Sequence, residues 1–291
     1  MLFNTYEPWK FAFSKDLADL NQIEKGSWGI IGIPFDSTTS YHSGARLGPT
    51  VVREASYGFE QFNTTFNKNI NPNFYDLGDS NVVPGNCKQT IDIVESNVNE
   101  LMEYGAKPIL IGGEHSISLG AIKALKRYHD DLTVVHLDAH RDLADTLIGE
   151  RYSHGTVMRR VHDLGVDSLI QIGIRSSSDS EEKFAEFSKN IITFKNREVK
   201  RHIDNILYYL TQIETPIYLS IDMDVFDISI APNVGNPVPF GISIEDVEDI
   251  IECLSLKDVV GLDVVETATN KLGDITAVSA SKIIYDFLTL I

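Results

Sequence analysis

Six short runs of almost uninterrupted apolar residues restrict the folds open to this 291-residue chain more than any other feature. They are Trp28–Phe35, Pro108–Ile111, Leu132–Leu137, Ser168–Ile174, Pro216–Ile221 and Val259–Val265. A strand with one face in water alternates apolar and polar residues, whereas a strand covered on both faces is apolar throughout. The runs therefore predict buried strands of a mostly parallel sheet.

Segments with helical periodicity lie between these runs. The clearest are Gln89–Tyr104, Leu119–Tyr128, Arg201–Leu210 and Ile244–Leu254. Strands that alternate with helices through right-handed crossovers form an open sheet with a helical layer on each face. No linker-like tract, repeat or low-complexity segment divides the chain. The sequence predicts an α/β fold of three layers, α/β/α, with residues 1–291 in a single domain.

Charge and cysteine content exclude several classes of protein. With 25 Lys and Arg against 42 Asp and Glu, the net charge is −17, which disfavours nucleic acid because binding it requires clustered cations. An acidic surface serves solubility in general, and it also favours the approach of a small cation. Cys87 and Cys253 lie far apart, which indicates neither a disulfide framework nor a thiolate zinc site.

The sequence also predicts a cytoplasmic protein that does not bind membranes. The first residues, MLFNTYEPWKFAF, lack the basic start and long apolar run of an export signal. No stretch approaches the roughly 18 consecutive apolar residues that a membrane span needs. The small number of cysteines fits a reducing compartment.

Ionisable residues directly follow four of the predicted strands. The segments are GGEHS after Ile111, DAHRD after Leu137, DMD after Ile221 and VET at the last strand. Ligands of open parallel sheets bind outside the carboxyl ends of the strands. We therefore expect the four segments to meet in one crevice.

Two of these segments place carboxylates close together. Asp138, His140 and Asp142 alternate along an extended chain and so face one side, and Asp222 and Asp224 repeat this spacing. Close carboxylates repel each other unless a cation neutralises them. This favours a metal site over the alternative, a solvated strand end with incidental charges.

His115, in the segment IGGEHSIS, adds a second imidazole, although a lone His at such a turn is more often structural. Two imidazoles and four carboxylates exceed the needs of one tetrahedral zinc and suit two ions with five or six ligands each. Oxygen-rich ligation favours Mn²⁺, and a pair of such ions activates a shared water for hydrolysis. Motifs for nucleotides and for nucleophilic serines are absent, and no organic cofactor is predicted.

Together, the motifs GGEHS, DAHRD, SIDMD and GLDVVE resemble those of the ureohydrolase family of agmatinases and arginases. The resemblance extends to GIPFDSTTSYHSGARLGP and QIGIRS, so it spans nearly the whole chain. It implies that His115, Asp138, Asp142 and Asp222 bind one manganese ion. It also implies that Asp138, His140, Asp222 and Asp224 bind a second, so that Asp138 and Asp222 bridge the pair.

The resemblance further implies a reaction and three catalytic residues. In such enzymes a hydroxide held by the two ions attacks the guanidinium carbon, and the intermediate collapses to urea and an amine. Asp142 resembles the carboxylate that passes a proton to the departing nitrogen, and Glu266 the one that pairs with the guanidinium. His154, in YSHGTVMRR, resembles a mobile proton-shuttling histidine. A solvated Glu and a surface His are the alternatives for the last two.

Agmatine, a small cationic guanidino compound cleaved to putrescine and urea in polyamine biosynthesis, is the predicted substrate. Arginases have an Asn that helps to hold the amino-acid end of arginine where this chain has Ala144, and Gly32–Pro49 is more similar to agmatinases. The chain departs from agmatinases at Arg141, usually Thr, and in a longer loop that contains Arg151. Arg151 is either a surface cation or a contact for a carboxylated substrate tail.

Several alternatives stay open. The first is hydrolysis of arginine, guanidinobutyrate, formiminoglutamate or another guanidino or formimino compound. A one-zinc deacetylase of related fold would leave His115 and Asp142 without a role. An inactive metal-binding subunit would have no use for Glu266 and His154. The resemblance also implies a homotrimer or a homohexamer.

Overall fold

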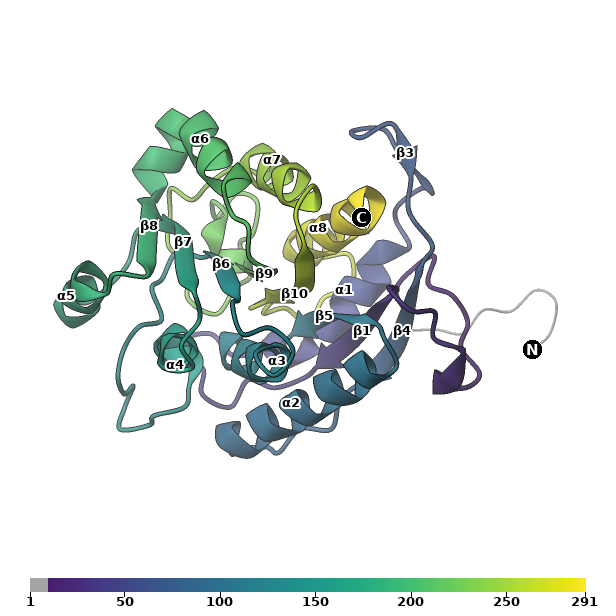
Figure 1. Ribbon diagram of the computed structural model, residues 1–291, viewed down its shortest axis with the longest axis horizontal. Helices are drawn as coiled ribbons and strands as arrows, with labels where there is room; N and C mark the ends of the chain where they lie inside the picture. Colours follow the sequence, from purple (N-terminus) through teal and green to yellow (C-terminus); the bar gives the residue numbers. More distant parts are fainter. Residues whose placement is uncertain (1–9) are drawn as a thin grey trace.

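The computed structural model describes residues 10–291, in which eight strands form one central sheet (Figure 1). In chain order they are β1 (Trp28–Ile33), β4 (Phe74–Asp79), β5 (Lys107–Gly112), β6 (Thr133–Leu137), β7 (Ser168–Ile174), β8 (Ile191–Lys195), β9 (Ile217–Asp222) and β10 (Val259–Val265). Across the sheet the order is β4-β1-β5-β10-β9-β6-β7-β8, and all neighbours run parallel. The prediction of a mostly parallel sheet in an α/β fold is confirmed.

The six strands predicted from the apolar runs are the six inner strands of this sheet. Every side chain of β1, β6, β9 and β10 is buried, which explains why their sequences are apolar without alternation. The two edge strands, β4 and β8, were not predicted, because each is partly exposed and carries polar residues. A separate antiparallel ribbon pairs β2 (Phe62–Asn63) with β3 (Lys68–Asn69).

Helices cover both faces of the sheet (Figure 1). One face carries α1 (Gly48–Ser56), α6 (Asn196–Thr211), α7 (Ile244–Ser255) and α8 (Ile275–Leu290). The other carries α2 (Cys87–Glu103), α3 (Ser118–Leu125) and α4 (Val157–Asp163), and α5 (Asp179–Phe187) lies beside β8. In β5, Ile109 and Ile111 pack into the first of these cores and Leu110 into the second, as the alternation of side chains along a strand requires. The four helices predicted from periodicity correspond to α2, α3, α6 and α7.

The four strands that precede the ionisable motifs are neighbours at the centre of the sheet, in the order β5-β10-β9-β6. Their register is level at the carboxyl ends, because Val264 pairs with both Ile111 and Ile221, and Ile221 pairs with Leu137. Segments far apart in the sequence therefore begin at the same height on one edge of the sheet. The expected convergence follows from this order and register.

Among residues 10–291, no helix combines the length and the apolar character that crossing a membrane requires. The first nine residues, on which the prediction of a missing export signal partly rests, lie outside the described residues. That all 291 residues form a single domain stays a prediction.

Candidate metal centre and catalytic cleft

His115 follows β5 at the start of a 3₁₀ turn and is 1% exposed. Its Nε2 lies 2.9 Å from Ser220 Oγ. The Ser220 hydroxyl donates to Asp263 at 2.7 Å, so it accepts the proton of His115 Nε2. The other ring nitrogen, Nδ1, is buried and has no hydrogen-bond partner among the described residues. This nitrogen is therefore the one available to a metal ion.

Three carboxylate oxygens surround His115 Nδ1. The Oδ2 atoms of Asp138 and Asp222 each lie 3.1 Å from it, and that of Asp142 lies 3.3 Å away. Asp138 and Asp142 belong to the segment after β6, whereas Asp222 ends β9. The structure thus brings together the four side chains that the sequence assigned to one ion.

A second group of side chains surrounds His140, whose side chain is 24% exposed. His140 Nδ1 lies 2.9 Å from Asp224 Oδ2 and 3.5 Å from Asp138 Oδ1. Backbone amides hold these acids in place, since Asp224 Oδ1 accepts from Ala139 N at 3.0 Å and Asp222 Oδ1 accepts from Asp224 N at 2.8 Å. Asp138 contacts both groups, as a bridging ligand would.

The buried acids of the cluster repel one another, and a bound cation would stabilise their charged forms. Burial, followed by the charge of Asp138, raises the pKa of Asp142 to about 7. Burial, followed by the charges of Asp224 and Asp138, raises the pKa of Asp222 well above its usual value. Burial opposes the charged form of His115, but contact with these acids raises its pKa overall. Without a metal ion, the proton on His115 is thus the positive charge among the acids. Acidic oxygens with imidazole nitrogens are a donor set that fits divalent metal ions.

Arg175, in the segment QIGIRS, fastens the loop that carries Asp224. Its guanidinium donates to the carbonyl oxygens of Asp224, Phe226 and Val238 at 2.6–3.2 Å. Burial lowers the pKa of Arg175, although nearby acids, Asp224 first among them, oppose that shift. The contacts explain why a chain segment outside the predicted ligand set belongs to the same site.

His136, inside β6, is a buried neighbour of the cluster that the sequence did not single out. It lies close enough to His115, Asp138 and Asp142 to be a metal ligand. However, both of its nitrogens have protein partners: Nε2 lies 2.8 Å from Asp138 Oδ2, and Nδ1 lies 3.1 Å from Gln171 Nε2. We therefore interpret His136 as a support for Asp138, because neither nitrogen is left for a metal.

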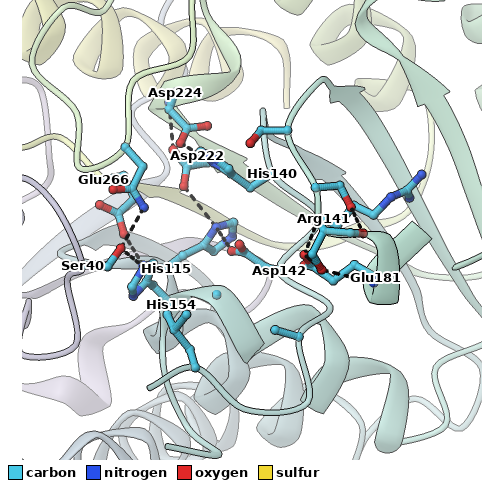
Figure 2. Close-up of a pocket in the computed structure, with 17 residues that line it drawn as sticks. Ser40, His115, His140, Arg141, Asp142, His154, Glu181, Asp222, Asp224 and Glu266 are labelled. Carbon is cyan, nitrogen blue, oxygen red and sulfur yellow. Dashed lines mark hydrogen bonds and ion pairs between the residues drawn. The ribbon is translucent and has the colours of Figure 1, made fainter. Parts of the chain in front are cut away.

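Arg141 faces away from the cluster, because it lies between His140 and Asp142 along the chain (Figure 2). Its guanidinium pairs with Glu182 of α5 at 2.7 and 3.1 Å and donates to Gln171 Oε1 at 2.9 Å. Because arginine has donors only, it holds the amide of Gln171 with the oxygen toward itself and the NH₂ group toward His136. Arg141, where the chain departs from the agmatinase pattern, thus supports Asp138 indirectly, through Gln171 and His136.

A cleft of about 200 Å³ opens above the cluster. Seven of the eight predicted site residues line it, and the eighth, Asp138, lies beneath them in contact with His115 and His140. The seven are His115, His140, Asp142, His154, Asp222, Asp224 and Glu266. Asp142 and Glu266 adopt left-handed backbone conformations, with φ of 54° and 65°, which cost energy in residues other than glycine and recur at functional sites.

Glu266 lies at the wall of the cleft just beyond β10. Its Oε1 accepts from the backbone amide of His115 at 2.9 Å. A Cβ atom at Gly235 would lie 2.4 Å from the other oxygen, Oε2, so glycine is needed there to leave room for the carboxylate. Burial, followed by the charge of Glu114, raises the pKa of Glu266 to about 8. A cation bound beside it would restore its charged form.

His154 also lines the cleft, where it lies between two hydroxyl groups. Its Nδ1 lies 3.3 Å from Thr38 Oγ1 and its Nε2 lies 3.1 Å from Ser40 Oγ. Burial, followed by the charges of His115 and His140, lowers the pKa of His154 to about 4. In this conformation the ring is therefore neutral near pH 7. Thr38 and Ser40 belong to the GIPFDSTTSYHSGARLGP block, which the sequence linked to the family but not to His154.

Small and acidic residues line the outer part of the cleft. They include Ala144, Gly155, Ser177 and Glu181. Arg141 is the one Lys or Arg in this described lining, and Glu182 pairs with its guanidinium. The side chain of Arg151 is 57% exposed and approaches Asp145 and Asp163, which matches the surface-cation alternative.

Known proteins match this chain over most of its length. A family model described as the arginase family matches residues 27–289. The N(1)-aminopropylagmatine ureohydrolase of Thermococcus kodakarensis is 38% identical over 97% of this chain and 94% of its own, and the agmatinase of Pyrococcus horikoshii is 33% identical over 98% and 97%. The solved agmatine ureohydrolase of Thermoplasma volcanium superposes with a TM-score of 0.85 at 32% identity, covering 98% of this chain and 94% of that one.

Proposed function

This chain belongs to the arginase family of metal-dependent hydrolases, and we propose that it binds two Mn²⁺ ions and hydrolyses agmatine to putrescine and urea. The observation that carries the proposal is the pair of His and Asp groups that share Asp138 beneath the cleft. His115, Asp138, Asp142 and Asp222 would hold one ion. Asp138, His140, Asp222 and Asp224 would hold the other. When bound, the two ions supply a water of lowered pKa as the nucleophile.

Glu266 would position the guanidinium group. One of its oxygens accepts from the His115 amide, and the other has no hydrogen-bond partner among residues 10–291. A planar carboxylate forms charge-assisted hydrogen bonds to a guanidinium in two directions. Pairing would hold the guanidinium carbon above the cluster, toward the nucleophile.

Asp142 and His154, which both line the cleft, would handle the protons of the reaction. Asp142 is a carboxylate, which can take up a proton and release it again. Its position beside His115 and in the cleft lining suits a proton transfer to the departing nitrogen. His154 is neutral in this conformation and would accept a proton from water in the cleft and pass it on.

The lining of the cleft favours a substrate whose tail is a cation. Glu181 lines the cleft, and its carboxylate accepts from Leu143 N and Ser178 but has no ion-pair partner among the described residues. The guanidinium of Arg141, in contrast, is already paired with Glu182. A carboxylated tail, as in guanidinobutyrate or formiminoglutamate, would meet acids without a compensating cation. N(1)-aminopropylagmatine is a second candidate, because it also has a cationic tail and is the substrate named for the relative from Thermococcus kodakarensis.

A comparison of substrates tests the proposal. The protein is freed of metal, loaded with Mn²⁺ and given agmatine, N(1)-aminopropylagmatine, arginine, guanidinobutyrate and formiminoglutamate separately. Urea is measured for the four guanidino compounds, and formamide is measured for formiminoglutamate, whose formimino carbon carries hydrogen in place of a third nitrogen. Urea should form chiefly from a compound with an amine tail, agmatine first, and a Glu266→Gln variant with unchanged metal content should lose most of this activity. Preference for a carboxylated compound would show that agmatine is not the substrate. An inactive manganese-loaded protein would favour the alternative of a metal-binding subunit.

Two further expectations stay predictions. These are a cytoplasmic location and assembly into a homotrimer or a homohexamer.

A further inference from the structure

Glu114, which precedes His115 in the GGEHS motif, is 0% exposed and points away from the metal ligands toward the loop of Thr38. Its carboxylate accepts three hydrogen bonds, from Thr38 N at 2.7 Å, from Thr38 Oγ1 at 2.5 Å and from Ser116 Oγ at 2.6 Å. The reaction described above assigns no role to this buried acid. Glu114 is connected to His154 through the single hydroxyl of Thr38, and this connection indicates its role.

The hydrogen bonds of the Thr38 hydroxyl can be assigned completely. Burial raises the pKa of Glu114, but the three donors around its oxygens, Ser116 Oγ and the amide and hydroxyl of Thr38, favour the ionised form. A threonine hydroxyl has one proton and two lone pairs, and an ionised carboxylate can only accept, so the proton of Thr38 Oγ1 goes to Glu114. Both lone pairs then face His154. One accepts the His154 backbone amide at 3.1 Å, and the other faces Nδ1 at 3.3 Å. Nδ1 must therefore carry the ring proton.

The same reasoning assigns the second ring nitrogen. In neutral histidine one nitrogen has the proton, so Nε2 has the lone pair and accepts from Ser40 Oγ, 3.1 Å away. Ser40 in turn accepts from Asn236 Nδ2 at 3.3 Å, and Ser40, Asn236 and His154 all line the cleft. The basic nitrogen of His154 thus faces the side on which a substrate binds.

We propose that Thr38, held by Glu114, is a positioning residue that fixes the Nδ1–H tautomer of His154 and makes Nε2 the nitrogen that exchanges protons with the cleft. The inference rests on the proposed function in one respect only, the use of His154 in proton transfer. The chain Glu114–Thr38–His154 parallels the arrangement in which a carboxylate orients a catalytic histidine, with a hydroxyl between the two groups. Protonation at Nε2 leaves the Nδ1–H bond to Thr38 intact, so the ring keeps its orientation in both charge states.

Three threonine variants separate this role from a general effect on the loop. Thr38→Val keeps the shape of the side chain but removes the acceptor for Nδ1–H. Thr38→Ser restores a hydroxyl. Thr39→Val is the matched control, because the Thr39 hydroxyl donates to the Asp36 carbonyl at 3.2 Å and does not reach His154. Manganese content and melting temperature are measured for each protein before its kinetics.

For agmatine, Thr38→Val should lower kcat by about tenfold to a hundredfold and leave KM within about twofold, because proton transfer is impaired and binding is not. Thr38→Ser should recover most of that loss, and Thr39→Val should match the parent. A kcat for Thr38→Val equal to that of the parent, or an equal loss in Thr39→Val, would overturn the proposal.

¹⁵N NMR of the ring nitrogens gives a readout that does not depend on turnover. The chain has eight histidines, so the His154 signals are assigned by their disappearance in His154→Gln. In the parent protein Nδ1 should be protonated and Nε2 unprotonated, and Thr38→Val should shift both signals toward the other tautomer. Protonation of Nε2 in the parent would refute the tautomer assignment. If the parent shows the expected tautomer but releases no urea, the proposed function fails and the assignment stands.

Discussion

Binding of manganese to the metal-free protein should release protons, and the affinity should rise with pH. The reason lies in the buried acids around His115. In the absence of a cation, Asp142 has a pKa of about 7, because it is buried beside Asp138, and the pKa of Asp222 is raised well above its usual value. A carboxylate must lose its proton before it can bind a metal, so protons and Mn²⁺ compete for the same oxygens.

The size of the effect follows from Asp142. With a pKa of about 7, roughly one tenth of this group is ionised at pH 6 and roughly nine tenths at pH 8. Asp142 alone should therefore strengthen manganese binding by about tenfold between pH 6 and pH 8, equivalent to about 1.4 kcal/mol. Asp222 acts in the same direction, so tenfold is a lower bound.

Calorimetry tests this directly. Mn²⁺ is titrated into chelator-treated protein at pH 6 in buffers that differ in ionisation enthalpy, and the number of protons released is the slope of the observed enthalpy against that quantity. Dissociation constants at pH 6, 7 and 8 are measured in parallel by competition with a chelator. Asp142→Asn, which has no carboxyl proton to lose, should release about one proton fewer. Equal enthalpies in all buffers and an affinity independent of pH would refute the reasoning.

Four further predictions concern single residues or the fold. Asp138→Asn should lose manganese and activity but keep its circular dichroism spectrum, and elemental analysis that finds both ions at full occupancy would contradict the ligand assignment. Glu181→Gln should raise KM for agmatine by about tenfold with kcat nearly unchanged, because a charge-assisted contact to the amine tail is weakened; an unchanged KM would remove Glu181 from the binding site. Arg141→Met should weaken manganese binding by about tenfold, because it removes an indirect support of a ligand. Lys195→Met is the control: it removes another partner of Glu182 and should leave the affinity unchanged, as measured by chelator competition for both variants. With a chelator present, the melting temperature should fall as the pH rises from 6.5 to 8. The reason is that Glu266, with a pKa of about 8, keeps its proton in the folded state and loses it in the unfolded state. A melting temperature that rises with pH would contradict this.

Local sequence was sufficient for the inner part of the sheet and for the residues around the predicted metal centre. The six inner strands were predicted because burial on both faces requires apolar residues without alternation, a property of each segment alone. The spacing of Asp138, His140 and Asp142 predicted their convergence through the alternation of an extended chain, although the structure has Asp142 in a left-handed conformation beyond the end of β6. The structure accordingly brings all three to the same cluster.

The edge strands and the supporting side chains could not be predicted in this way. β8 is only half-buried, so its composition differs little from that of a loop. His136 looks like an ordinary strand residue until β7 places Gln171 beside it. Thr38 becomes relevant to His154 only when the loop after β1 meets the turn before α4, two segments 116 residues apart.

The amino-acid sequence by itself therefore determined the class of fold and the chemical composition of the site, since burial and charge repulsion act on short stretches. The tertiary structure decided which side chains support that site: Arg141 through Gln171, and Glu114 through Thr38. The order of strands places distant segments side by side, and a hydrogen bond of about 3 Å depends on that placement rather than on local composition.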